Sequence, residues 1–139
     1  MAVKTIVWDV PSQAQGNMTD LTPRLENEVT ASGLQDGIAT VFVTGSTAGV
    51  STIEWERGLL SDFKVMQERW IPENLQYAHN EGERDDNGHS HLRATMLGPS
   101  LTVPFTAGQL HLGTWQQVVL VDFDTKPRSR RIICQVMGE

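Results

Sequence analysis

Two histidines lie one residue apart in the stretch "DDNGHSHLRATMLG", at positions 89 and 91, and His79 lies ten residues before the first of them. If residues 91–98 form a strand that begins near His89, alternate side chains project to one face, so His89, His91 and Arg93 would point together. Neutral imidazoles are preferred zinc ligands, and catalytic zinc sites keep one position open. The pattern predicts a metal or acid–base centre beside a cation, with His79, His89 and His91 as candidate ligands. Exposed loop histidines are the alternative interpretation.

The stretch "TGSTAGVSTIE", residues 44–54, is rich in glycine and hydroxyl side chains. Its backbone N–H groups and the hydroxyls of Ser46 and Thr47 could hold an anion, and Arg93 could add a charged donor. A Walker phosphate loop is excluded because the Gly-Lys-Ser/Thr ending is missing. A bend in which small residues let two backbones approach is the alternative. Glu54 stands between two large apolar residues, which predicts a partly buried carboxylate suited to a metal ligand or general base; a surface glutamate is the alternative.

The elements that must position these residues follow from the spacing of apolar side chains. Two amphipathic segments predict helices near residues 19–33 and 57–72. Six apolar segments predict strands, at residues 3–10, 37–44, 91–98, 100–105, 108–124 and 130–138. Short turns join the last four strands, which favours antiparallel neighbours. We therefore expect an α+β fold with a mostly antiparallel sheet of about six strands and two main helices packed on one face.

Length and charge narrow the classes of function. A chain of 139 residues is typical of one domain, here expected over residues 1–139. The net charge of −6 argues against nucleic-acid binding, although a short basic run at 126–131 is either a solvated turn or a small anion pocket. No apolar run is long enough to span a membrane, and the N-terminus lacks the pattern of a secretory signal, so a cytoplasmic location is expected. The single cysteine, Cys134, is expected in the core.

Five segments follow one another along the chain in a characteristic order: "DGIATVFVTGSTAGVSTIEWE", "YAHN", "NGHSHLRATMLGPSLTVPF", "LHLGTWQQVVLVDFD" and "PRSRRIICQVMGE". On these segments, which run nearly from end to end, the chain resembles the YjbQ-like family. The resemblance implies an α+β fold, a homotrimer, a cleft that holds histidines and a carboxylate, and a link to secondary thiamine phosphate synthase activity.

The family's cluster carries over to Glu54, His79 and His91, its basic residue to Arg93, and its Trp-Gln pair to Trp115 and Gln116. The chain departs from the family at two other positions. Many members have a histidine where this chain has Gly45, and many have an aspartate where it has His89. We therefore hypothesise that His89 supplies the imidazole lost at position 45.

The resemblance implies an enzyme that joins an aminomethylpyrimidine diphosphate to a thiazole phosphate, with a small phosphorylated metabolite as its partner. The implied catalytic residues are Glu54, His79, His91 and Arg93. The implied substrate-binding residues are Ser46, Thr47, Arg93 and Gln116. A divalent metal, zinc or magnesium, is the candidate cofactor, held by His79, His89 and His91. The alternatives are a trimeric module that binds a metal or anion, a metal-dependent phosphohydrolase, and a purely structural trimer.

Overall fold

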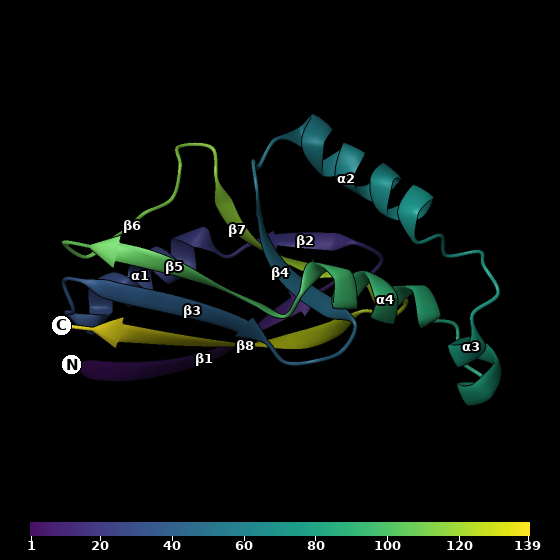
Figure 1. Cartoon of the computed structure of the whole chain (residues 1–139), viewed down its shortest axis with the longest axis horizontal. Coiled ribbons are helices and arrows are strands. Elements are labelled where there is room, and N and C mark those ends of the chain that lie inside the picture. The colour runs from purple at the N-terminus through teal and green to yellow at the C-terminus, as the bar shows by residue number, and fades with distance from the viewer.

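Eight strands and four helices follow one another along the chain in the computed structural model, which describes residues 1–139 (Figure 1). The strands are β1 (Ala2–Ser12), β2 (Asn17–Asp20), β3 (Gly37–Val43), β4 (Ala48–Ile53), β5 (Ser100–Thr106), β6 (Gln109–Leu110), β7 (Gln117–Asp122) and β8 (Arg128–Gly138). The helices are α1 (Thr22–Ser32), α2 (Arg57–Trp70), α3 (Ala78–Glu83) and α4 (Gly88–Leu97). The two main helices predicted from the sequence are α1 and α2.

The strands form two sheets instead of one. The larger sheet has the order β1-β8-β3-β5-β6, and the smaller has the order β2-β7-β4. Every pairing in both sheets is antiparallel. The predicted α+β class and the antiparallel pairing are therefore confirmed, while the strands divide between two layers.

The main core lies between the two sheets and is closed by α1. Leu21, Leu25 and Val29 are spaced four residues apart and are at most 2% exposed, so this stripe of α1 faces the core as predicted. The helix begins where Asp20 accepts a hydrogen bond from the backbone of the first helical residue at 3.0 Å. It ends at Gly33, whose φ of 74° is the left-handed conformation that glycine adopts most readily.

A second, smaller core covers the other face of the small sheet. Val119 and Val121 of β7 pack there against Ala94 of α4, and Phe63 of α2 joins them. Alternate residues of β7 belong to the main core, so this strand is buried on both faces and its apolar run is nearly continuous. Consequently α1 and α2 lie on opposite faces of the small sheet, whereas the sequence led us to expect both helices on one face.

Helix α2 lies at the edge of the molecule (Figure 1) and buries none of its residues fully. Its first turn is capped by Glu56, whose carboxylate accepts from the backbone N–H groups of Gly58 and Leu59. Val65, Met66 and Trp70 remain 49%, 58% and 66% exposed, an unusual apolar face for a lone chain. No helix in the structure has the length and apolar character needed to cross a membrane.

The strand predicted at residues 91–98 is wrong, because this segment belongs to helix α4. Arginine, alanine, methionine and leucine in this segment are good helix formers. Buried Ser90 and Ala94 are one helical turn apart, on the side that packs against β4. The approach is so close that a Cβ at Gly49 of β4 would lie 2.8 Å from the carbonyl oxygen of Gly98. Gly49 therefore serves backbone packing, the alternative we gave for this stretch.

Candidate functional site

Two of the predicted site histidines meet where α3 contacts α4. The ring centroids of His79 and His91 are 4.6 Å apart, and their planes cross at 65°. The Nε2 atom of His79 lies 3.0 Å from the Oδ1 atom of Asn87, which fixes the orientation of that ring. Both side chains are half-buried. Two imidazoles in contact can exchange a proton or share a divalent cation, so this histidine pair, His79 and His91, is a candidate chemical centre.

His89 points away from the histidine pair, so the predicted alignment of positions 89, 91 and 93 is wrong. In a helix, residues two positions apart differ by about 200° around the axis, which sends His89 and His91 to opposite sides. His89 is only 4% exposed, and its Nδ1 atom has no hydrogen-bond partner. Burial lowers the pKa of His89, and the nearby charge of Arg93 lowers it further. The ring is therefore neutral near pH 7.

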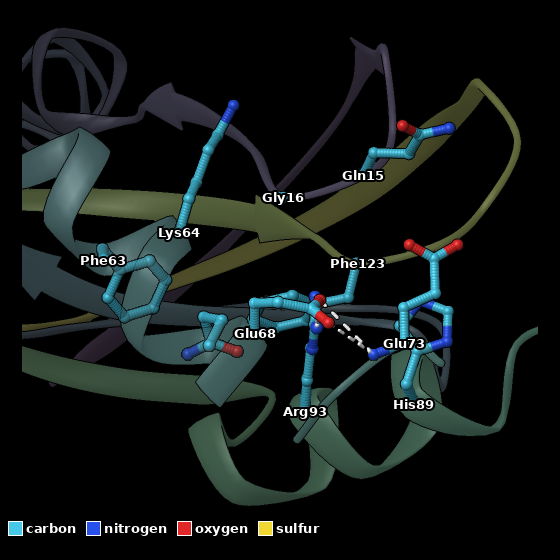
Figure 2. Close-up of a pocket in the computed structure, with 10 residues that line it drawn as sticks. Gln15, Gly16, Phe63, Lys64, Glu68, Glu73, His89, Arg93 and Phe123 are labelled. Carbon is cyan, nitrogen blue, oxygen red and sulfur yellow. Dashed lines mark hydrogen bonds and ion pairs between the residues drawn. The ribbon is translucent and has the colours of Figure 1, made fainter. Parts of the chain in front are cut away.

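Arg93 lies one turn after His89, on the same side of α4, and ties that helix to the end of α2. Its Nε and Nη2 atoms donate to the backbone oxygen of Ile71 at 2.9 and 2.7 Å. Nη2 also donates to Glu68 at 2.8 Å (Figure 2). The Arg93 side chain is 10% exposed. These contacts engage Nε and Nη2 with protein groups, and the predicted role of Arg93 in holding an anion stays a prediction.

In the loop before β4, the two hydroxyls that we assigned to substrate binding lie in different environments. Ser46 is exposed, but Thr47 is 3% exposed and fully engaged. Thr47 accepts a hydrogen bond from Arg130 at 2.6 Å and donates one to Asp124 at 3.0 Å. Arg130, in turn, makes two contacts of 2.8 Å with the buried carboxylate of Asp122. Thr47 thus belongs to a buried ion-pair network, and this part of the basic run is neither a solvated turn nor an open anion pocket.

Glu54 and Gln116 lie away from the histidine pair. Glu54 directly follows β4 and is exposed, so the partly buried carboxylate that we expected is not observed. Helix α2, about 21 Å long at 1.5 Å per residue, runs from the end of β4 toward α3 (Figure 1). Gln116 is also exposed, and its amide nitrogen lies 3.3 Å from the hydroxyl of Thr52. It lines a second, open cavity of about 430 Å³ between β4 and β5.

The candidate metal site has two of its three predicted ligands together. No group of three or more His, Cys, Asp or Glu side chains in the chain is arranged to hold one metal ion. Catalytic zinc sites use three protein ligands and one open position. The histidine pair therefore fits part of such a donor set, and one chain does not complete it. Metal binding remains a prediction that depends on a ligand from elsewhere.

The comparisons with known proteins agree with this fold over nearly the whole chain. The family model described as UPF0047 protein YjbQ-like matches residues 7–139. The chain belongs to the YjbQ-like family. A UPF0047 protein of Methanothermobacter thermautotrophicus is 40% identical over 139 residues, which cover 100% of this chain and 95% of that protein. A UPF0047 protein of Mycobacterium tuberculosis is 39% identical over 130 residues, with coverages of 92% and 95%.

Solved structures of similar proteins have the same fold as this YjbQ-like chain. A YbjQ-like protein of unknown function from Sulfolobus solfataricus P2 has a TM-score of 0.94 at 35% identity, and the match covers 99% of each chain. A hypothetical protein from Aeropyrum pernix K1 has a TM-score of 0.90 at 29% identity, with coverages of 98% and 99%. The family resemblance and the α+β class expected from the sequence are confirmed.

One departure from the YjbQ-like pattern has a structural basis in this chain. Gly45, the position at which the family resemblance implies a histidine in many members, has a φ of 132°. A Cβ at this position would lie 2.8 Å from the Nη1 atom of Arg130. The loop is thus built around the absence of a side chain at position 45, and a histidine here would require Arg130 to move. His89 as the replacement imidazole stays a hypothesis.

Sequence reasoning missed Gln67 and Glu73, which line a cavity together with His89 and Arg93. A signal for Gln67 was present, since this polar residue lies within the apolar stripe of α2, one turn after Phe63. Glu73 follows the helix in an exposed segment and gave no comparable signal.

Proposed function

We propose that this YjbQ-like chain is the subunit of a homotrimeric synthase that joins an aminomethylpyrimidine diphosphate to a thiazole phosphate. In this reaction the carbon–oxygen bond to diphosphate breaks, and the thiazole nitrogen forms a bond to the same methylene carbon. Diphosphate leaves with the electron pair of the broken bond. The protein must hold both substrates in line and stabilise the leaving group.

The contact between His79 and His91 is the observation that carries the proposal. It brings together two of the residues that the family resemblance assigns to the catalytic cluster, from separate helices, with one ring oriented by Asn87. Such a pair can donate hydrogen bonds to the leaving diphosphate or bind a divalent ion that does so. Zinc or magnesium would add a positive charge beside the diphosphate oxygens.

A second subunit would complete the site, because Glu54 lies apart from the histidine pair in one chain. The exposed apolar residues around the site support such an interface. They lie on α2 and α4 and in the segments that adjoin α2, and they are Trp55, Val65, Met66, Trp70, Leu75, Leu92 and Met96. We therefore assign Glu54, Trp115 and Gln116 to the neighbour's contribution, opposite the histidine pair.

Mixing two inactive variants tests the shared site. His91→Ala and Glu54→Ala should each abolish synthase activity when measured alone. When equal amounts are dissociated and reassembled together, a site is intact only if one subunit supplies the histidine and its neighbour the glutamate. Each condition holds with a chance of one half, so the mixture should recover about one quarter of wild-type activity in a cyclic trimer.

The matched control mixes His79→Ala with His91→Ala. These residues form one pair within a single chain, so no arrangement of subunits restores it and the mixture should stay inactive. Wild-type protein without synthase activity, with or without zinc or magnesium, would reject the proposed reaction. Recovery in both mixtures would reject the assignment of the histidine pair to one subunit.

A metal- or anion-binding module is the second candidate, because two imidazoles in contact are themselves part of a zinc donor set. Equilibrium dialysis against zinc distinguishes the two candidates when it is combined with the synthase assay. Zinc uptake that is lost in His79→Ala, without synthase activity in wild type, favours the module.

A further inference from the structure

Asn87 lies immediately before α4, at the position where an asparagine side chain usually caps a helix. Its side chain makes no capping hydrogen bond to the first turn of α4. Instead, Oδ1 of Asn87 lies 3.0 Å from Nε2 of His79, on α3. The side chain is thus diverted from the helix to the histidine pair, which indicates a role for Asn87 beyond helix formation.

The connection between α3 and α4 is held from both sides. The backbone N–H of Gly88 donates to Oδ1 of Asn80 at 2.8 Å. A Cβ at Gly88 would lie 2.7 Å from the Cβ of Tyr77, so the two helices meet as closely as a glycine allows. The hydroxyl of Thr125 donates to Asp86 at 2.9 Å, which ties the segment before α4 to the turn between β7 and β8. The amide that contacts the histidine pair therefore has a fixed base.

The buried carboxylate of Asp124, in the same turn, decides which way the amide of Asn87 points. Asp124 is 3% exposed. Burial raises the pKa of Asp124, but the hydrogen bonds that it accepts, one of them from the side chain of Asn87, and the charge of Arg128 outweigh this and hold the pKa below 3.8. An ionised carboxylate can only accept hydrogen bonds. The NH2 group of Asn87 therefore faces Asp124, and its carbonyl oxygen faces His79.

This orientation of the amide determines the tautomer of His79. A carbonyl oxygen has no hydrogen to donate, so Nε2 of His79 must carry the proton of this hydrogen bond. In the neutral ring the other nitrogen, Nδ1, then holds the lone pair. Nδ1 of His79 makes no hydrogen bond within the chain and is not among its buried unpaired atoms, so the lone pair is open to solvent. The ring of His91 has no such partner, so its tautomer is not fixed.

We propose that Asn87 is a positioning residue that, oriented by Asp124, holds His79 in its Nε2–H form, so that His79 acts through the lone pair of Nδ1. A hydrogen bond at one ring nitrogen commonly fixes the tautomer of a working histidine in this way. What the lone pair does rests on the proposed function. Neutral His79 has no spare N–H group for the diphosphate, so it accepts a cation or a proton, and His91 supplies the free N–H group. The tautomer itself rests on the contacts alone.

Nitrogen-15 NMR of the intact protein tests the proposal, at a pH of about 8.5 that lies well above the usual histidine pKa of about 6.5. In the wild type, His79 should show a protonated Nε2, an unprotonated Nδ1 and a slowly exchanging Nε2–H proton. His91 should show signals averaged over its two tautomers. Free histidine already favours the Nε2–H form modestly, so the decisive quantity is the change in the tautomer ratio of His79 between the wild type and its variants.

Asn87→Ala should lower the ratio of the Nε2–H to the Nδ1–H form of His79 about tenfold and abolish the slowly exchanging proton, because the ring loses its acceptor. Asp124→Asn should lower the ratio by a smaller factor, because the amide of Asn87 can then rotate. Asn74→Ala, at an exposed position before α3, is the matched control and should leave the ratio unchanged. A wild-type His79 protonated on Nδ1, which no folding defect of a variant can mimic, or an unchanged ratio in Asn87→Ala would overturn the proposal. An unchanged ratio in Asp124→Asn would reject the part assigned to Asp124.

The outcomes distinguish this inference from the proposed function. A tautomer ratio that depends on Asn87, in a protein without synthase activity, would support the positioning role and reject the synthase. Synthase activity in a protein whose His79 is protonated on Nδ1 would support the synthase and reject the positioning role.

Discussion

The buried ion pair between Arg130 and Asp122 gives the sharpest prediction for stability. The two side chains are 2% and 0% exposed and are joined by two contacts of 2.8 Å. Arg130→Met removes the cation but retains most of the apolar stem, so Asp122 is left buried beside no positive charge. Breaking a buried pair in this way costs about 3–5 kcal/mol. Since small domains have about 5–15 kcal/mol in total, this variant should lose at least about a fifth of its stability.

Urea unfolding at one fixed protomer concentration measures the effect, since subunit association would otherwise alter the midpoint. The double variant Arg130→Met with Asp122→Asn removes both charges, and its loss should be smaller than the sum of the two single losses by about 1–3 kcal/mol. Arg131→Met is the matched control: the Arg131 side chain is 63% exposed and 3.9 Å from Asp9, so its loss should stay within about 0.5 kcal/mol. A loss below about 1 kcal/mol for Arg130→Met, or additive losses in the double variant, would refute the reasoning.

Three further expectations concern Arg93, His89 and Cys134. Arg93→Met removes the donors to the Ile71 carbonyl, so it should lower the free energy of unfolding by about 1.5–3 kcal/mol and speed amide hydrogen exchange at the end of α2. The control Arg69→Met should change neither. The pKa of His89 is lowered on folding, so stability is lost as pH falls below the ordinary value of 6.5; urea unfolding between pH 7 and 5 should show a smaller pH dependence in His89→Leu. Burial raises the pKa of Cys134 from 9.0 to about 11, so the native thiol should resist alkylation at pH 8.5 until the protein unfolds. The free energy of unfolding should also fall between pH 9 and 11, because only the unfolded thiol ionises in that range.

Local patterns predicted the parts of the fold that depend on one clear periodicity. The stripe of Leu21, Leu25 and Val29 specifies α1, and the apolar run of β7 specifies a strand buried on both faces. The error at α4 came from reading alternate residues of a short segment as a strand, because ten residues carry little periodic information and packing against β4 decides the outcome. The error carried over to the site, since the direction of His89 relative to His91 depends on the type of element.

Arg130 shows a signal that the sequence contained and that strand periodicity could have revealed. It lies two, four and six residues before Ile132, Cys134 and Val136, so it faces the core on β8. A buried arginine requires an acidic partner, and Asp122 is the carboxylate at the end of the buried strand β7, which precedes β8 in the sequence. The pairing itself could not be predicted, because it depends on how the two sheets pack.

Helix α4 explains how two neighbouring histidines can share one short segment without sharing an environment. His91 faces α3 and the other imidazole, while His89 and Arg93 face α2 and a cavity with balanced charge. Opposite faces of one helix separate these surroundings by about 10–12 Å, the diameter of a helix with its side chains, so one small substrate does not occupy both.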